Sequence, residues 1–423
     1  MKKMFCSLLV GLVIVASCKK EEPMVVTSGF RVTIENVFAP KDYFSEGVSD
    51  AVGPGSSTSY SFHAGKGHFL SFATMFAQSN DLFYAFPETG ISLYDANGNA
   101  LTGDITNMVN LYDAGTEVNQ EPGVGVDQAP RQSASNTGIA EGGTVNLITT
   151  IPDGFTYPAD DAVIKVSISH DGGTMFTVTL SNVSDLSSFQ TPLAPGVWVI
   201  HYENQKPLFS IGATASTELE ALAEDGINQG IMDQLNLSSG YVSPIAPGVF
   251  SISKNENPIF MLSDLASNEL ESLSEDGNPS GFSTLLDGNV DVVEYGIFNT
   301  PSAGSSPAPV FPGEKYEFTF TASVGDKLSF ATMLVQTNDL FIGLDKLTLF
   351  NGSTPISGDI TASLMLYDAL TETNEYPGAG NSQAPRQGSA NMGTTETGTI
   401  SIVADNFSYP GISEMVTVTI SPM

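Results

Sequence analysis

The sequence predicts a mostly β protein with two β domains. At 423 residues it is longer than one ordinary hydrophobic core needs. Its 41 Gly and 24 Pro are spread through apolar stretches, which indicates many short elements joined by turns. Strands with one buried face are predicted where apolar and polar residues alternate, at 30–34, 176–180, 316–321 and 416–420.

The N-terminus has the pattern of an export signal. Lys2 and Lys3 precede an apolar run, residues 4–16, that is too short to span a bilayer. The run ends at Val-Ala-Ser-Cys, which resembles a bacterial lipobox. We therefore predict a signal peptide at 1–17 and lipidation of Cys18; the alternative is an ordinary signal peptide with a chance cysteine.

A lipidated tether at 18–28 follows from this interpretation. Its Lys-Lys-Glu-Glu start resembles the tether of bacterial lipoproteins that are displayed at the cell surface. We expect an outer-membrane lipoprotein of the cell envelope, exposed at the surface and touching the membrane through the anchor only. Cys6 is removed with the signal, so no disulfide is expected.

Charge disfavours one class of partner. The formal net charge is −32, from 15 Lys and Arg against 47 Asp and Glu. Such a surface repels DNA and RNA, and no basic stripe offsets it, so no nucleic-acid partner is expected. Solubility in salt and binding of hard cations both remain open as reasons for the imbalance.

Two stretches of the chain repeat each other. Ser-Phe-Ala-Thr-Met, Asn-Asp-Leu-Phe and Leu-Tyr-Asp-Ala occur in this order from Ser71 and again from Ser329, each followed by Gln-Ala-Pro-Arg-Gln. The most strictly kept positions are acidic and turn-like: Asp81, Asp113 and Glu117 in the first copy, and Asp339, Asp368 and Glu372 in the second. The pattern suggests a carboxylate site made twice.

Alignment of the copies predicts the domain limits. Residues 30–37 match 176–183 as a first strand, which gives a short first domain at 29–170 and a full second domain at 174–423. The second carries an insertion, 193–281, that is itself duplicated. In each half a segment such as 218–226 has apolar residues at helical spacing with a closing glycine, so short amphipathic helices are predicted there.

These segments together resemble the N-terminal domain of spondins, which also occurs in bacterial lipoproteins. The resemblance rests on Pro-Gly-Val-Trp, Leu-Glu-Ala-Leu-Ala-Glu-Asp-Gly, Phe-Asn-Thr-Pro, Asn-Asp-Leu-Phe and Tyr-Asp-Ala, in order over nearly all of 174–423. The first copy lacks the first two motifs and is included through the internal repeat. The doubled helix segment departs from the single one usual in the family.

The resemblance implies two C2-like antiparallel β-sandwiches in tandem, with Ca²⁺ held by loops at one end. Asp339, Asp368 and Glu372 take the family's ligand positions, with Glu in place of a second Asp; Asp81, Asp113 and Glu117 follow through the repeat. The residue chemistry agrees, because Ca²⁺ prefers six to eight oxygen ligands. The four histidines lack zinc spacing.

Each singled-out residue also has a plainer interpretation. For the acidic residues the alternative is that they close Asx-type turns by accepting backbone N–H bonds. Arg131 and Arg386 are expected to fix a loop against carbonyls or a carboxylate rather than touch a ligand. Trp198 is expected in the core, with exposed sugar stacking as the alternative.

No catalytic motif stands out, so the chain is predicted not to be an enzyme. We expect a calcium-binding surface lipoprotein that acts in adhesion or ligand binding, with extracellular matrix, a glycan or a protein as partner. The alternatives are a surface polysaccharide hydrolase, with two facing carboxylates in a cleft, and a metal-free structural spacer.

Overall fold

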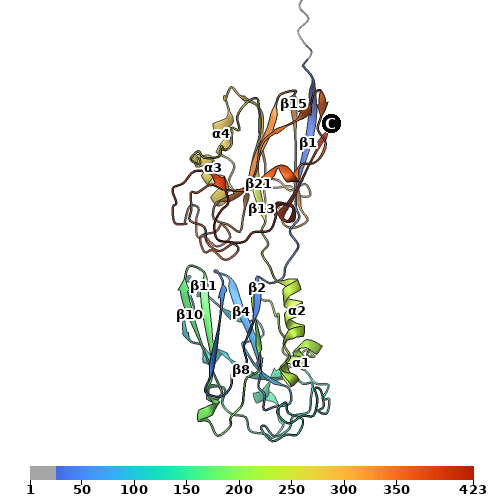
Figure 1. Cartoon of the computed structure of the whole chain (residues 1–423), viewed down its shortest axis with the longest axis vertical. Coiled ribbons are helices and arrows are strands. Elements are labelled where there is room, and N and C mark those ends of the chain that lie inside the picture. Colours follow the sequence, from blue (N-terminus) through green and yellow to red (C-terminus); the bar gives the residue numbers. More distant parts are fainter. Residues whose placement is uncertain (1–24) are drawn as a thin grey trace, which may run out of the picture.

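The computed structural model describes residues 25–423, and the protein is mostly β, as predicted. Antiparallel sheets pack in two units that follow one another along the long axis (Figure 1). The C2-like character of these units stays a prediction. The predicted signal peptide and Cys18 lie outside the described residues, and of the predicted tether only residues 25–28 are described, with Thr27 and Ser28 already in a strand.

The first sandwich is formed by residues 43–239. One sheet has the order β3-β11-β10-β7, and the other the order β2-β12-β4-β5-β8-β9 with β6 paired to β4. The strands are β2 Ser45–Ser49, β3 Ser57–His63, β4 His68–Met75, β5 Leu82–Ala85, β6 Ile91–Ser92, β7 Gly103–Asp104, β8 Asn110–Asp113, β9 Asn146–Leu147, β10 Ile164–Gly172, β11 Met175–Asn182 and β12 Gly196–Tyr202. Four 3₁₀ turns connect them, η1 Thr106–Met108, η2 Ile148–Thr150, η3 Asp160–Ala162 and η4 Ser184–Leu186.

The second sandwich is formed by residues 27–36 and 245–423. Its sheets have the orders β15-β1-β23-β20 and β14-β13-β16-β17-β21-β22, with a separate β18-β19 hairpin. The strands are β1 Thr27–Asn36, β13 Ile245–Ser253, β14 Val292–Phe298, β15 Lys315–Ser323, β16 Lys327–Leu334, β17 Leu340–Thr348, β18 Phe350–Asn351, β19 Thr354–Pro355, β20 Gly358–Asp359, β21 Leu364–Asp368, β22 Ser401–Ile402 and β23 Val416–Pro422. The turn η5 Thr361–Ser363 and the short helix α5 Ile412–Met415 complete it.

The N-terminal strand does not belong to the sandwich that follows it in sequence. β1 lies between β15 and β23 and buries Phe30, Val32 and Ile34 in the core of the second sandwich. Figure 1 shows β1, in blue, beside β15. β11 takes the same place in the first sandwich, between β3 and β10. The chain therefore inserts the whole first sandwich between β1 and β13 of the second.

This pairing corrects the predicted domain limits of 29–170 and 174–423. β10 and β11 form one hairpin, so a boundary at 170–174 would cut through a sheet of the first sandwich. In the second sandwich the matching position lies between β23 and β1, near the chain end, where the Met423 N–H donates to the Gly29 carbonyl at 2.9 Å. Alternation of apolar residues predicted both strands correctly but does not say which sheet each one joins.

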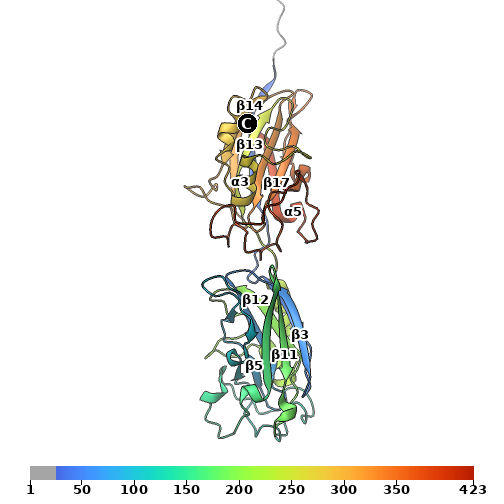
Figure 2. The ribbon, with the colours of Figure 1, turned by 90° about the vertical axis from the view of Figure 1, so that its left-hand side faces the viewer.

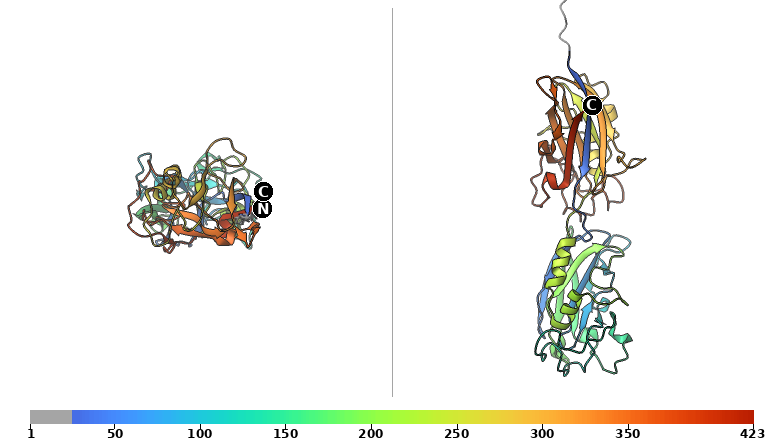
Figure 3. Two further views of the ribbon diagram at one scale, coloured as in Figure 1. Left: turned by 90° about the horizontal axis from the view of Figure 1, so that it is seen from above. Right: turned by 90° about the vertical axis from the view of Figure 1, so that its right-hand side faces the viewer.

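Helices lie against one sheet of each sandwich (Figures 1, 2 and 3, right). The first sandwich carries α1 Thr217–Asp225 and α2 Gln229–Ser238; the second carries α3 Asn268–Asp276 and α4 Phe282–Leu286. The predicted insertion 193–281 is thus divided between the two units and is not an insertion in one. The predicted helix ends are confirmed: Ser216 accepts a bond from the Leu219 N–H, and Gly226 closes α1 with φ of 67°.

A loop of the second sandwich joins the two units. Tyr376 stacks on His63 with ring centroids 3.7 Å apart, and Ala379 is fully buried among core residues of the first sandwich. Asn381 accepts a hydrogen bond from the Lys66 N–H at 2.8 Å and donates one to the Tyr94 hydroxyl at 3.1 Å. The units are therefore packed against each other as well as connected by the chain.

Matched substitutions in β1 and β11 test the strand exchange. Val32 and Val178 occupy equivalent, fully buried positions, and a buried unpaired charge costs several kcal/mol. Val32→Asp should unfold the second sandwich and Val178→Asp the first. Limited proteolysis with mass mapping identifies which unit is cut. The opposite result, with Val32→Asp exposing residues 43–170, would restore the original boundary.

The close approach at Gly65 gives a test of the interface. A Cβ there would lie 2.0 Å from the Ala379 carbonyl oxygen, whereas one at Gly53 meets nothing within 4 Å. Gly65→Ala should speed hydrogen exchange in residues 376–382 and lengthen the particle in X-ray scattering. Gly53→Ala is the control and should change neither. Equal exchange rates in the wild type and both variants would contradict the interface.

Candidate functional site

Strand pairing brings the predicted acidic residues of the first sandwich together. Leu82 at the start of β5 pairs with Asp113 at the end of β8, so Asp81 and Asp113 lie at the same end of these two strands. The turn after β8 places Glu117 over Asp81, whose Oδ2 accepts bonds from the N–H groups of Thr116 at 2.7 Å and Glu117 at 3.1 Å. The three predicted residues therefore meet at one end of the sandwich.

Other carboxylate oxygens hold the loops in place. Asp113 accepts bonds from the Gly115 N–H and the Asn119 amide, both at 2.6 Å. Glu117 accepts from the Asn80 amide at 3.2 Å and from the Gly138 N–H at 2.6 Å, which ties down a loop more than twenty residues away. The interpretation as turn-closing residues thus accounts for many of these oxygens.

The second sandwich repeats the arrangement. Asp339 Oδ2 accepts from the Thr371 and Glu372 N–H groups at 2.7 and 3.1 Å, and Asp368 from the Leu370 N–H at 2.8 Å. Glu372 accepts from the Gly393 N–H at 2.6 Å. Leu370 stands where the first copy has Gly115, and it takes the same left-handed backbone at φ of 54°. A non-glycine residue there shows that the turn geometry is strongly imposed.

Sequence reasoning missed a fourth carboxylate in each site. Glu224, near the end of α1, is 2% exposed, and Glu275, near the end of α3, is 3% exposed. The charge of Glu117 contributes to a raised pKa of Glu224, and the charges of Glu372 and Asp339 contribute to a raised pKa of Glu275. We define the first acidic cluster as Asp81, Asp113, Glu117 and Glu224, and the second as Asp339, Asp368, Glu372 and Glu275.

Each cluster contains buried carboxylate oxygens without a hydrogen-bond partner. In the first cluster these are Asp81 Oδ1 and Glu224 Oε2; in the second they are Asp339 Oδ1 and Glu275 Oε2. Buried oxygens of this kind normally have a partner, because leaving one unsatisfied costs about 1–3 kcal/mol, and more when it is charged. The same atoms are unpaired in both copies, which points to a shared reason.

Burial makes the ionised form of these carboxyl groups unfavourable. Burial, with a smaller contribution from neighbouring carboxylates, raises the pKa of Glu224 and of Glu275 to about 7. Burial, followed by the charge of Asp113, raises the pKa of Asp81, and burial, followed by the charge of Asp368, raises that of Asp339. Each cluster concentrates negative charge that needs a compensating proton or cation.

No lysine or arginine supplies that compensation within residues 25–423. The ion pairs there are Lys206–Glu88, Lys315–Glu317 and Lys346–Glu256, all outside the clusters. In the same part of the chain no three Asp, Glu, His or Cys side chains already stand in a metal-binding arrangement. Many of the cluster oxygens face N–H donors instead, so an ion would have to replace some of those bonds.

The two arginines and the tryptophan have the structural roles that were predicted. Arg131 donates from Nε to the Gly125 carbonyl at 2.7 Å and from a guanidinium N–H to the Gln78 side chain at 2.8 Å. Arg386 donates to the Gln336 side-chain oxygen at 2.8 Å and also to the Gly378 carbonyl. Trp198 is 8% exposed and stacks on Tyr60, so it belongs to the core.

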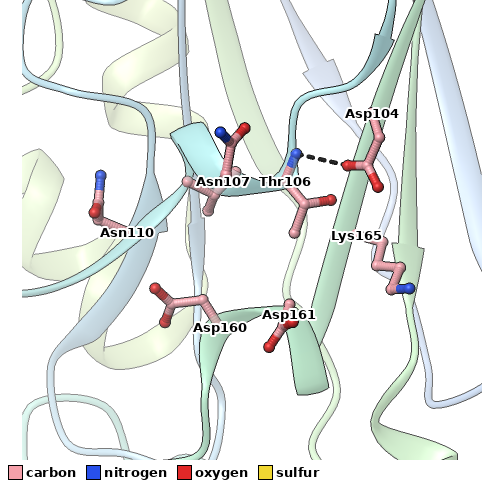
Figure 4. Close-up of a pocket in the computed structure, with 8 residues that line it drawn as sticks. Asp104, Thr106, Asn107, Asn110, Asp160, Asp161 and Lys165 are labelled. Atoms are coloured by element: carbon pink, nitrogen blue, oxygen red, sulfur yellow. Dashed lines mark hydrogen bonds between the residues drawn. The ribbon is translucent and has the colours of Figure 1, made fainter.

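A separate pocket of about 610 Å³ opens on the flank of the first sandwich (Figure 4). Its acidic residues are Asp104, which accepts a bond from the Thr106 N–H at 2.9 Å, and the neighbours Asp160 and Asp161. In Figure 4 Asp160 points toward Asn110, and Asp104 lies beside Lys165. The hydrolase alternative requires two carboxylates facing each other across a cleft, and it stays an alternative.

No protein-family model and no curated protein matches this chain. The likeness to spondin domains therefore stays a prediction. Within residues 25–423 no helix is both long and apolar enough to cross a membrane.

The raised pKa values predict how stability depends on pH without divalent cations. A carboxyl group whose pKa is higher in the folded chain contributes stability below its unfolded pKa of about 4 and loses it as pH rises through the folded value. For Glu224 and Glu275 that value is about 7. In a chelator the melting temperature should therefore fall between pH 5 and pH 8. Asp81→Asn with Asp339→Asn should flatten this fall, and a melting temperature that rises over the same range would contradict the prediction.

Proposed function

We propose that the chain is a cell-surface lipoprotein in which each sandwich binds Ca²⁺ through its acidic cluster and serves as an adhesion or ligand-binding module. The observation that carries the proposal is the pair of fully buried Asp81 and Asp339 side chains, each with an Oδ1 atom that has no partner. A cation beside that oxygen removes the cost of burying it uncompensated.

The donor set fits a hard cation. Each cluster offers four carboxylates, from a loop, a strand end, the turn after that strand and a helix. Asn119 or Asn374 adds an amide next to Asp113 or Asp368. Ca²⁺ accepts such mixed oxygen ligands at distances of about 2.3–2.6 Å and tolerates irregular geometry. Binding would turn Asp113 and Asp368 from some of their present hydrogen bonds toward the ion.

An ion in either cluster would fix the loops that form the end of the sandwich. Glu117 holds the loop at Gly138 and Glu372 holds the loop at Gly393, so neutralising the cluster stabilises both loops at their bases. The partner proposed for this end is extracellular matrix, a glycan or a protein, and the lipid anchor at Cys18 is the proposed contact with the membrane. The spondin-like identity of the sandwiches and the absence of enzymatic activity belong to the same proposal.

Calcium titration by calorimetry tests the sites directly. The wild type should bind two ions and melt at a higher temperature with Ca²⁺ than with a chelator. Asp339→Asn and Asp368→Ala should each abolish or weaken one site, by at least the roughly 10-fold that even outer-shell changes cost. Asp287→Ala, an exposed position after α4, is the control and should bind like the wild type.

The result also separates the alternatives. If Asp339→Asn and Asp368→Ala leave both the affinity for Ca²⁺ and the melting temperature unchanged, the second site is wrong. Should the wild type show no calcium dependence at all, the structural-spacer interpretation would be favoured over this proposal.

A further inference from the structure

We infer that Glu224 and Glu275 are further ligands of the two proposed ions, so that each ion joins the end of a helix to the loops of its sandwich. The inference rests on the proposed function and extends it from the loop carboxylates to the helices α1 and α3.

The position of these side chains carries the argument. Glu275 Oε2 is buried without a partner, and its carboxylate is close enough to Asp339 and Glu372 for their charges to act on it. Asp339 Oδ1 is unpaired in the same cluster. Two buried carboxylate oxygens without partners and with no basic group near them need a proton or a cation to compensate them, and a cation shared by both would do so at neutral pH.

The position of Glu224 and Glu275 at the C-terminal ends of their helices increases the need for a compensating cation. Glu224 and Glu275 lie in the last turn of α1 and α3, where the backbone carbonyls already concentrate negative charge, and neither helix has a basic residue in that turn. Carboxylates are favoured at the opposite end of a helix, and cations at this one. A buried acid at this place is costly by itself, and a bound divalent cation offsets both its own charge and the helix dipole.

Long loops lie over the helices and close the clusters. The Gln132 and Asn136 amides of the first loop donate to Asp225 and Glu220 of α1, both at 2.7 Å. The second loop does the same through Gln387 to Asp276 and Asn391 to Glu271, both at 2.9 Å. An ion bound by both the helix and the base of the loop would restrain the loop on the helix.

A helix-borne ligand also bears on selectivity. Ca²⁺ takes six to eight oxygens, whereas Mg²⁺ requires a tight octahedron and keeps several waters. Adding a fourth carboxylate to each cluster favours the larger ion. Loss of Glu275 should therefore reduce the preference for Ca²⁺ over Mg²⁺ as well as the affinity.

The experiment uses the chain from residue 19 onward with Asp81→Asn, so that only the second site is read. In this background Glu275→Gln is compared with Glu269→Gln, which lies in the first turn of the same helix. We expect Glu275→Gln to weaken Ca²⁺ binding at least 10-fold in calorimetry. It should also narrow the difference between the affinities for Ca²⁺ and Mg²⁺. Glu269→Gln should leave both unchanged.

Melting in a chelator separates a ligand from a structural residue. A ligand role predicts that Glu275→Gln melts at the same or a higher temperature than its parent without Ca²⁺ but gains less from Ca²⁺. If wild-type Ca²⁺ binding is present and Glu275→Gln binds as tightly as its parent, this inference fails while the proposed function stands. If the wild type binds no Ca²⁺, both are overturned.

Discussion

The placement of β1 between β15 and β23 is the constraint on which the rest of the structure depends. β1 precedes the whole first sandwich in the sequence, so the second core is complete only when residues separated by nearly the whole chain meet. As a result the chain passes from one unit to the other twice, once after β1 and once before β13. These two connections keep the units end to end. At the same junction the loop that carries Tyr376 packs against the first sandwich.

Local features of the fold could be predicted from the sequence, whereas its long-range pairing could not. Alternation identified the strands around Phe30 and Phe176, and a cap with a closing glycine identified α1, because these signals depend on neighbouring residues. The segments 30–37 and 176–183 share the same pattern of apolar and polar residues, so the pattern alone does not assign either strand to a sheet. Only the lengths of the connections and the packing of the whole chain decide between them, and the predicted domain boundary failed for that reason.

At the site, too, the sequence identified the residues that have a clear pattern and missed those that do not. The internal repeat identified Asp81, Asp113 and Glu117 and their counterparts, because three spaced acids were kept while apolar residues varied. Glu224 and Glu275 lie in predicted amphipathic helices. In α1 the apolar face is formed by Leu219, Leu222 and Ala223, and Glu224 lies outside that face although its side chain is buried. A loop carrying Gln132 and Asn136 covers that outer side. The recurrence of Glu-Asp-Gly at both helix ends was the available signal.

The two clusters are alike in chemistry but not in setting. Near the second cluster, Glu375 accepts bonds from the N–H groups of Asn381 and Ser382 and shares the Asn338 amide with Glu372. Asn381 in turn contacts the first sandwich, so the second cluster is linked through a few hydrogen bonds to the junction. In the first sandwich Val126 occupies the place of Asn381 and is 69% exposed. A cation bound in the second cluster, as proposed, would therefore also act on how the sandwiches are held together, whereas one in the first cluster would act on loops that do not contact the second sandwich through the equivalent residue.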